Sequence, residues 1–238
     1  MSNGKRVDPN LAMLGHVAAR LGVELCQRVV FVGGAAAGLL ITDLAVPTIR
    51  RTDDVDIVDP AVVLEEFQDV EARLRMLGFE NDSSSDVICR WLVDGISVDI
   101  MPSRKEILGF ANKWYPLSIQ TAETHTLANG MMIKVIRAPE FIATKLEAFY
   151  GRGEGDFLAS HDLEDIISVI DGRETVLFEC QNSNYQLRQY LGEEFADLLT
   201  TPAFINAIPG FLPPDPASQG RVENIMESLR QLSNINRQ

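Results

Sequence analysis

The chain has 238 residues, 46% of them hydrophobic, and a formal net charge of −13. This length and composition suit a globular protein with one large or two modest domains, and the negative charge argues against general binding to DNA or to anionic membranes. No apolar run is long enough for a membrane span, the polar N-terminus has no signal-peptide core, and three scattered cysteines form no C-x-x-C motif. We therefore expect a cytoplasmic protein with no membrane partner.

Apolar periodicity in the first part of the chain predicts helices alternating with strands. Asp59-Pro60 has the composition of a helix start, an N-cap residue followed by proline. The elements predicted in chain order are a helix over 8–25, a strand over 28–32, a helix over 35–44, a strand over 54–58 and a helix from Asp59 to Gly78.

Two hairpins follow in the sequence. Asp94-Gly95 separates alternating apolar runs over 87–93 and 96–101, and Asn129-Gly130 separates runs over 124–128 and 131–136. A further strand is predicted over 117–121.

The chain changes character after Ala138-Pro139, beyond which helical patterns dominate. Helices are predicted over 139–150, 161–170, 179–199 and 222–232. We predict an α+β fold with a mixed sheet flanked by helices in a core domain over 1–137, and a mostly helical, acidic C-terminal domain over 138–238.

Two carboxylates lie two residues apart on the strand predicted over 54–58. Asp54 and Asp56 point to one face of that strand, because residues i and i+2 of a strand share a face. Carboxylates held side by side repel each other unless a cation lies between them. The pair therefore suggests a Mg²⁺ site, and the alternative is an acidic strand edge. Asp99 is a third carboxylate on a strand, and its alternative is an acidic residue facing solvent.

Gly33-Gly34 lies between a predicted strand and a predicted helix. Glycines allow close approach of a ligand to the backbone, and a helix N-terminus offers free N–H groups to phosphate. A plain tight turn is the alternative.

The order of these motifs resembles the polymerase-β-type nucleotidyltransferase superfamily, whose pattern is a glycine turn, D-h-D-h and a later h-D-h. The chain looks closest to the AbiEii-like branch, which includes nucleotidyltransferase toxins of toxin–antitoxin systems. That branch shows R-x-[ST]-x-D-h-D, to which residues 51–56 are similar with the spacing R-T-x-D-h-D. It later shows a lysine followed by R-D-L-x-D-[IL], to which Lys145 and residues 161–166 are similar. The chain departs from this pattern at His161, where arginine is usual, and at Asp53, where a basic residue is common.

The resemblance implies a nucleotidyltransferase-type sheet and a metal-dependent enzyme of the phosphoryl-transfer class. Such an enzyme transfers an NMP from an NTP to an RNA or protein hydroxyl, with an antitoxin protein as a further partner. Two Mg²⁺ ions, or Mn²⁺ in their place, would be the cofactor. The residues it implies are Asp54, Asp56 and Asp99 for catalysis and metal, Gly33, Gly34, Arg51, Thr52 and Lys145 for the nucleotide, and Arg152, Asp162 and Asp165 for the acceptor or for support.

Two alternatives remain open at this point. A small cationic acceptor, as in aminoglycoside-type nucleotidyltransferases, suits the acidic C-terminal half better than RNA does. A catalytically inactive partner-binding protein with the same fold is the second alternative. For Lys145 the alternative is a surface lysine on an amphipathic helix.

Overall fold

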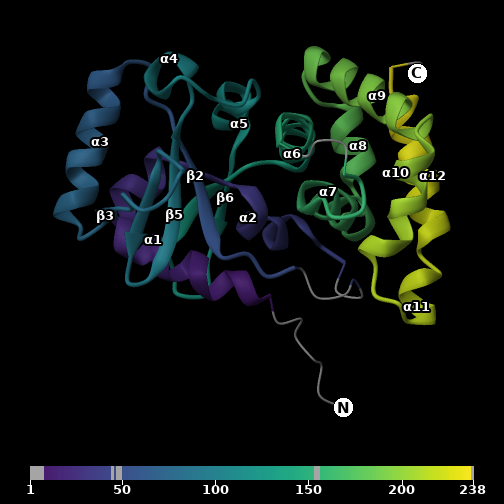
Figure 1. Cartoon of the computed structure of the whole chain (residues 1–238), viewed down its shortest axis with the longest axis horizontal. Helices are drawn as coiled ribbons and strands as arrows, with labels where there is room; N and C mark the ends of the chain where they lie inside the picture. The colour runs from purple at the N-terminus through teal and green to yellow at the C-terminus, as the bar shows by residue number, and fades with distance from the viewer. Residues whose placement is uncertain (1–7, 44–45, 47–49, 153–155, 237–238) are drawn as a thin grey trace. The chain divides into compact units, whose positions relative to one another are not determined.

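A mixed sheet of seven strands organises residues 8–39 and 50–137 of the chain (Figure 1). The computed structural model describes residues 8–43, 46, 50–152 and 156–236. The strands are β1 (Val30–Val32), β2 (Asp54–Asp59), β3 (Glu80–Asn81), β4 (Arg90–Val93), β5 (Ile96–Pro102), β6 (Glu123–Thr126) and β7 (Met132–Val135). Their spatial order is β3-β4-β5-β2-β1-β7-β6.

The centre of the sheet combines parallel and antiparallel pairs. Strand β2 runs parallel to β5 and antiparallel to β1, and β1 runs parallel to β7. Both predicted hairpins are present, as β4–β5 and β6–β7. Asp94 and Gly95 both have positive φ, as the tight two-residue turn requires. This turn fixes the register of β4 on β5.

Helices accompany the sheet in this part of the chain, and α1 packs against β7, β2 and β5. Asp8 caps α1 by accepting a hydrogen bond from the backbone N–H of Asn10, as the Asp-Pro start predicts. The helices are α1 (Pro9–Arg28), α2 (Gly33–Leu40), α3 (Leu64–Met76), α4 (Lys105–Leu108) and α5 (Tyr115–Thr121).

The predicted helix start at Asp59 is wrong. Asp59 is the last residue of β2, and its fully buried carboxylate is paired with Arg28 at 2.7 Å. That carboxylate also accepts the N–H of Ala61 in a local turn, so α3 begins only at Leu64.

The predicted strand over 117–121 is also wrong, because these residues belong to α5. Proline in the first turn favours a helix start. The hydroxyl of Ser118 donates to the carbonyl of Trp114, and that of Thr121 donates to the carbonyl of Leu117. Both are i to i−4 bonds along a helix, and a five-residue apolar pattern is too short to separate a strand from a helix.

The second unit comprises residues from Ala138 onward together with 40–43, and it is helical. Helix α6 packs on α7, and α9 packs on α12. The predicted helix over 179–199 is interrupted before Asn184, which caps α9 by accepting the N–H of Gln186. The elements are α6 (Ala138–Arg152), α7 (His161–Gly172), α8 (Val176–Gln181), α9 (Tyr185–Leu199), α10 (Pro202–Ala207), η1 (Ile208–Phe211), α11 (Pro216–Gln219) and α12 (Val222–Ser233).

The predicted α+β class, with a mixed sheet flanked by helices and a mostly helical C-terminal region, is confirmed. In the described part of the chain, no helix has both the length and the apolar composition of a membrane span.

Candidate functional site

Asp54 and Asp56 lie on one face of β2, as the sequence predicts. Both are partly exposed, whereas Val55 and Ile57 on the opposite face are fully buried. The two buried neighbours anchor the strand in the core, so the two carboxylates are held side by side on a rigid support.

Asp99 lies beside this pair on the neighbouring strand. Parallel pairing of β2 with β5 places Asp99 opposite Asp56 in register. Asp99 alternates with the apolar residues of β5 as predicted, but it is only 7% exposed. The alternative of an acidic residue facing solvent is therefore wrong for Asp99.

Gly33 lies directly against the carboxylate of Asp56. Antiparallel pairing of β1 with β2 sets Val32 opposite Asp56, and Gly33 follows as the first residue of α2. A Cβ atom at Gly33 would lie 1.8 Å from Oδ2 of Asp56, and the φ of Gly33 is +64°. Only glycine fits this position, and it brings the N-terminus of α2 to the carboxylates.

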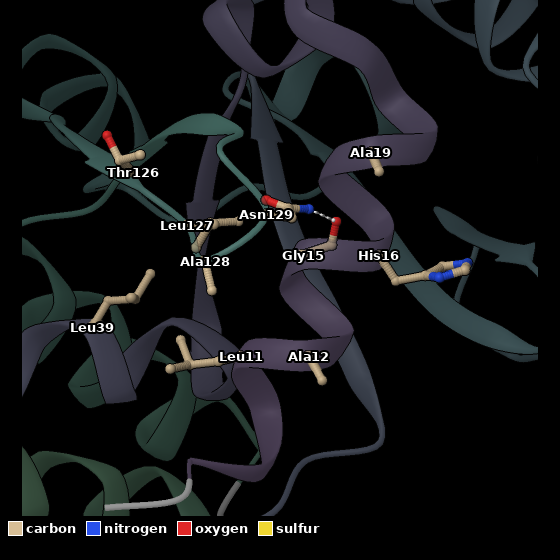
Figure 2. Close-up of a pocket in the computed structure, with 10 residues that line it drawn as sticks. All are labelled: Leu11, Ala12, Gly15, His16, Ala19, Leu39, Thr126, Leu127, Ala128 and Asn129. Atoms are coloured by element: carbon tan, nitrogen blue, oxygen red, sulfur yellow. Dashed lines mark hydrogen bonds between the residues drawn. The ribbon is translucent and has the colours of Figure 1, made fainter. Parts of the chain in front are cut away.

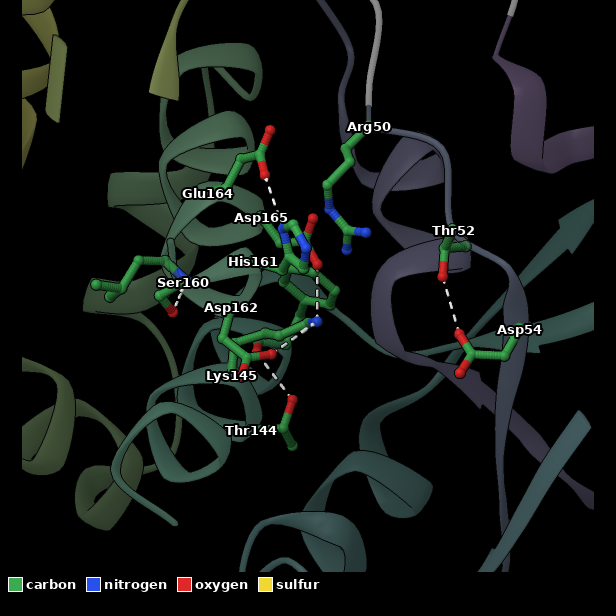
Figure 3. A network of polar contacts seen from close by, with 12 residues as sticks. Arg50, Thr52, Asp54, Thr144, Lys145, Ser160, His161, Asp162, Glu164 and Asp165 are labelled. Atoms are coloured by element: carbon green, nitrogen blue, oxygen red, sulfur yellow. Dashed lines mark hydrogen bonds and ion pairs between the residues drawn. The ribbon is translucent and has the colours of Figure 1, made fainter. Parts of the chain in front are cut away.

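Thr52 orients Asp54 (Figure 3). Its hydroxyl donates to Oδ1 of Asp54 at 2.8 Å. Asn10, which is fully buried in α1, holds the segment before β2 by accepting the N–H of Thr52 and donating to the carbonyl of Arg50. The sequence analysis missed Asn10, since a single asparagine in an amphipathic helix carries no motif.

Arg90 is a further residue of this site that the sequence analysis missed. It lies on β4 opposite Asp99, and its Nε and Nη2 atoms each donate to a separate oxygen of Asp99 at 2.8 Å. Nη2 also donates to Oδ2 of Asp54 at 3.0 Å. Hydrogen bonding to Asp99 raises the pKa of Arg90 above its ordinary value, and the charges of Asp99, Asp54 and Asp56 add to this effect.

The acidic side chains on β2 have the donor type that Mg²⁺ prefers. Carboxylate oxygens are its preferred ligands, and one or two carboxylates with substrate phosphates commonly hold it. Both oxygens of Asp54 accept hydrogen bonds, from Thr52 and Arg90, and both oxygens of Asp99 accept from Arg90. Among the described residues, no three acidic, histidine or cysteine side chains form a ready-made metal site. The residues fit Mg²⁺ in donor chemistry, and the predicted two-metal site stays a prediction.

Lys145 belongs to the helical unit and lies between two aspartates (Figure 3). Its Nζ is 3.1 Å from Oδ1 of Asp162 and 2.7 Å from Oδ2 of Asp165. All three residues are buried, with Lys145 only 7% exposed. Lys145 is therefore not a surface lysine, and the i, i+3 spacing of the aspartates on α7 supplies its partners.

Two arginines predicted for the site, Arg51 and Arg152, have no described contact with the carboxylates among the residues that the structure covers. Arg51 is exposed. The side chain of Arg152 lies outside the described residues.

An apolar cavity of about 590 Å³ lies elsewhere on the sheet unit, between α1 and the turn after β6 (Figure 2). Asn129 donates to the carbonyl of Gly15 beside it at 2.8 Å. Its lining includes Leu11, Leu39 and Leu127 and none of the predicted site residues. The cavity is therefore separate from the carboxylate cluster.

Comparison with known proteins found similar solved structures but no similar sequence. No family model matches the sequence, and no curated protein matches it significantly. The fold is similar to the solution structure of the antibiotic-resistance factor ANT(2'')-Ia, with a TM-score of 0.46 and 16% identity over 82% of this chain and 97% of that one. JHP933 from Helicobacter pylori gives a TM-score of 0.43 and 12% identity over 97% of this chain and 92% of that one.

A further H. pylori protein, described as a candidate nucleotidyltransferase, gives a TM-score of 0.43 and 12% identity over 100% of this chain and 95% of that one.

Proposed function

We propose that the chain is a Mg²⁺-dependent nucleotidyltransferase that transfers an NMP group from an NTP to an acceptor hydroxyl. The observation that carries this proposal is the fit of Gly33 against Asp56, with Asp54 on the same strand and Asp99 in register on the next. The N–H groups at a helix N-terminus can bind the phosphates of a metal–triphosphate complex. The clustered carboxylates beside it can bind the metal ion of the same complex. Polymerase-β-type nucleotidyltransferases, which the sequence resembles, have the same order of motifs along the chain: a glycine turn, a D-h-D strand and a later strand with a third aspartate.

The proposed reaction is an in-line displacement at the α-phosphorus of the NTP. The bond from the acceptor oxygen to this phosphorus forms as the bond to pyrophosphate breaks, and pyrophosphate leaves with that electron pair. Asp99, whose two oxygens each accept a hydrogen bond from Arg90, would take up the hydroxyl proton on a remaining lone pair. Asp54 and Asp56 would hold the divalent cation, which when bound neutralises charge developing on the phosphate oxygens. Backbone N–H groups of Gly33 and Gly34 would bind the β- and γ-phosphates.

The resemblance assigns Lys145 to the triphosphate, Arg51 and Thr52 to the nucleotide, and Arg152, Asp162 and Asp165 to the acceptor or to support. Thr52 already has a supporting contact, because it orients Asp54. The ammonium of Lys145 is engaged by Asp162 and Asp165. A contact of Lys145 with phosphate would therefore require it to exchange partners.

An RNA or protein hydroxyl is the acceptor that the resemblance to AbiEii-like toxins favours, and an antitoxin protein would then be a partner. The net charge of −13 opposes binding to RNA, so an RNA acceptor would need local basic contacts. A protein hydroxyl carries no such requirement.

A small cationic acceptor is a second candidate, favoured by a specific cavity in the helical unit. This cavity of about 420 Å³ is lined by the aromatic rings of Tyr150 and Phe157 and by the carboxylates of Glu194 and Asp197. Aromatic faces and carboxylates together attract amines and guanidinium groups.

A labelling experiment tests the proposal. The protein is incubated with Mg²⁺ and each of the four α-³²P-labelled NTPs, together with a cell extract or a panel of polyamine and aminoglycoside compounds. Label in RNA or protein supports the toxin-like acceptor, and label in a small molecule supports the second candidate. If no label transfers and no NTP binds with Mg²⁺, the proposed nucleotidyltransferase function fails.

A further inference from the structure

Asp54 lies where the sheet pairing of β2 is incomplete. The pairing with β1 runs from Val58 to Asp56, because β1 ends at Val32, opposite Asp56. Within the described strands, Asp54 is therefore paired on one side only, with Ser97 of β5. The end of a strand opens more readily than its centre does. A carboxylate at this place needs support from outside the sheet to keep one direction.

Asn10 supplies two backbone bonds next to this end of β2. Its Nδ2 atom donates to the carbonyl of Arg50 at 3.0 Å, and its Oδ1 atom accepts the N–H of Thr52 at 3.1 Å. A carboxamide carries both a donor and an acceptor, so this one side chain holds two backbone groups as a neighbouring strand would. Asn10 is fully buried, and water therefore does not compete for the two bonds.

The start of α1 fixes the position of Asn10 itself. Asn10 is the second residue of this helix, and its backbone N–H donates to Oδ1 of Asp8 at 2.8 Å. The helix packs against β2, β5 and β7. The amide of Asn10 is therefore presented from a rigid element rather than from a loop.

Thr52 links the anchored segment to the carboxylate (Figure 3). Its backbone N–H is bonded to Asn10, and its hydroxyl donates to Oδ1 of Asp54 at 2.8 Å. Because threonine is branched at Cβ, few side-chain rotamers are open to it, and the direction of its hydroxyl follows its backbone closely. Arg90 donates to the other oxygen, Oδ2, at 3.0 Å. Loss of the Thr52 bond would leave Asp54 held from one side only.

We propose that Asn10 is a positioning residue of the carboxylate site, which acts on Asp54 through Thr52. This inference rests on the proposed nucleotidyltransferase function. Without the amide of Asn10, the backbone of residues 50–52 would be held less tightly and the Thr52 hydroxyl would lose its fixed direction. Asp54 would then have to be ordered each time a metal–nucleotide complex binds, and this ordering lowers the affinity.

A double-mutant cycle tests whether Asn10 acts through Thr52. Isothermal titration calorimetry measures the affinity for the α,β-methylene analogues of ATP, GTP, CTP and UTP in the presence of Mg²⁺. The proteins compared are wild type, Asn10→Ala, Thr52→Val, Thr52→Ser and the double variant Asn10→Ala/Thr52→Val. Asn129→Ala is the matched control, because the Asn129 amide also joins α1 to another segment. It donates to the carbonyl of Gly15 from the turn between β6 and β7.

The two single changes should have similar effects that do not add. We expect Asn10→Ala and Thr52→Val each to weaken the affinity about tenfold, because each frees Asp54 from a hydrogen bond to its charged group. The double variant should also be about tenfold weaker, since both changes remove the same contact. Thr52→Ser keeps the hydroxyl and should lose less affinity than Thr52→Val. Asn129→Ala should bind within about twofold of wild type.

Each outcome decides the matter. Equal affinities of Asn10→Ala and Asn129→Ala overturn the inference and leave the proposed function standing. A loss in the double variant that equals the product of the two single losses also overturns it, because Asn10 and Thr52 would then act independently. If wild type binds no analogue with Mg²⁺, the proposed function fails and the inference fails with it. If the Asn10→Ala protein does not fold, the same cycle with Asn10→Ser decides, because serine is too short to make both backbone bonds.

Discussion

Both units of the chain place one cation between two aspartates, and they differ in how far water reaches the charges. In the helical unit, the side chain of Lys145 is 9% exposed and those of its partners Asp162 and Asp165 are 8% and 3% exposed. In the sheet unit, the side chains of Arg90 and Asp54 are 23% and 31% exposed. The first cluster is sealed, whereas the second has an open side.

We expect this difference to decide which cluster depends more on its internal partners and which can more readily exchange them for a ligand. A buried charge that loses its partner is strongly destabilising, since no water replaces the contact. A partly exposed carboxylate can be rehydrated or can exchange one cation for another. The comparison predicts that changes at Lys145 act mainly on stability, and that changes around Asp56 act mainly on ligand binding.

Lys145→Met should give the largest loss of stability. It removes the charge but keeps an apolar chain of similar length, so Asp162 and Asp165 stay buried without the ammonium between them. We expect the free energy of unfolding to fall by about 3–5 kcal/mol in urea denaturation. The exposed Lys105→Met should change it by less than about 0.5 kcal/mol. If Lys145→Met lowers the free energy of unfolding as little as the control does, water must reach the cluster. That result would contradict the difference in exposure between the two clusters.

Gly33→Ala should have the next largest effect. The new methyl group would collide with the carboxylate of Asp56 and would also require alanine at positive φ. Gly109→Ala is a matched control, because Gly109 has a φ of +84° with no atom within 4 Å of its added Cβ. The free energy of unfolding of this control should fall by about 1–2 kcal/mol, because alanine is strained at positive φ.

Gly33→Ala should lose more stability than this control in the same denaturation experiment, and it should lose Mg²⁺-dependent NTP binding as well. Equal losses for the two variants, with nucleotide binding retained in both, would contradict the close packing of Gly33 on Asp56.

The cysteines of the sheet unit should give a smaller, pH-dependent effect. Burial raises the pKa of the Cys26 thiol to about 11 and that of the Cys89 thiol to about 12, from an ordinary value of 9.0. The unfolded chain therefore releases these protons at a lower pH than the folded chain does. Stability from this source is complete below pH 9 and falls as the pH rises toward 11 and 12.

The measurement is the free energy of unfolding at several pH values for wild type and for a Cys26→Ala/Cys89→Ala variant. The variant should show a shallower decline above pH 9. Equal slopes would mean that the two thiols are as hydrated in the folded chain as in the unfolded chain.

Much of the carboxylate site could be predicted from the sequence, because short-range patterns determine it. The D-x-D spacing fixes a shared face for Asp54 and Asp56, and Gly33-Gly34 marks the end of a strand. Arg90 was missed, although the Asp94-Gly95 turn determines its partner: a two-residue turn sets 93 against 96, and hence 90 against 99. The register of Arg90 on Asp99 is therefore determined by residues close to each other in the sequence.

Long-range contacts explain the errors in the predicted fold. Asp59 resembles an N-cap in sequence, but Arg28, which lies 31 residues earlier, takes its carboxylate. The helix α5 was mistaken for a strand because its pattern is short and its hydroxyl bonds are not visible in the sequence. The burial of Lys145 likewise depends on the packing of α6 on α7, and the spacing of residues along one helix cannot show it.

Binding of a nucleotide to Asp56→Asn tests the central claim most directly. Isothermal titration calorimetry measures the binding of α,β-methylene NTP analogues in the presence of Mg²⁺ and in the presence of EDTA. The proteins compared are wild type, Asp56→Asn and Asp53→Asn. Asp53 is an exposed neighbour, so Asp53→Asn is a control for the same change of charge. We predict Mg²⁺-dependent binding to wild type and Asp53→Asn, and its loss in Asp56→Asn with the fold intact. Binding to Asp56→Asn as tight as to Asp53→Asn would show that the metal–nucleotide site is not at these carboxylates.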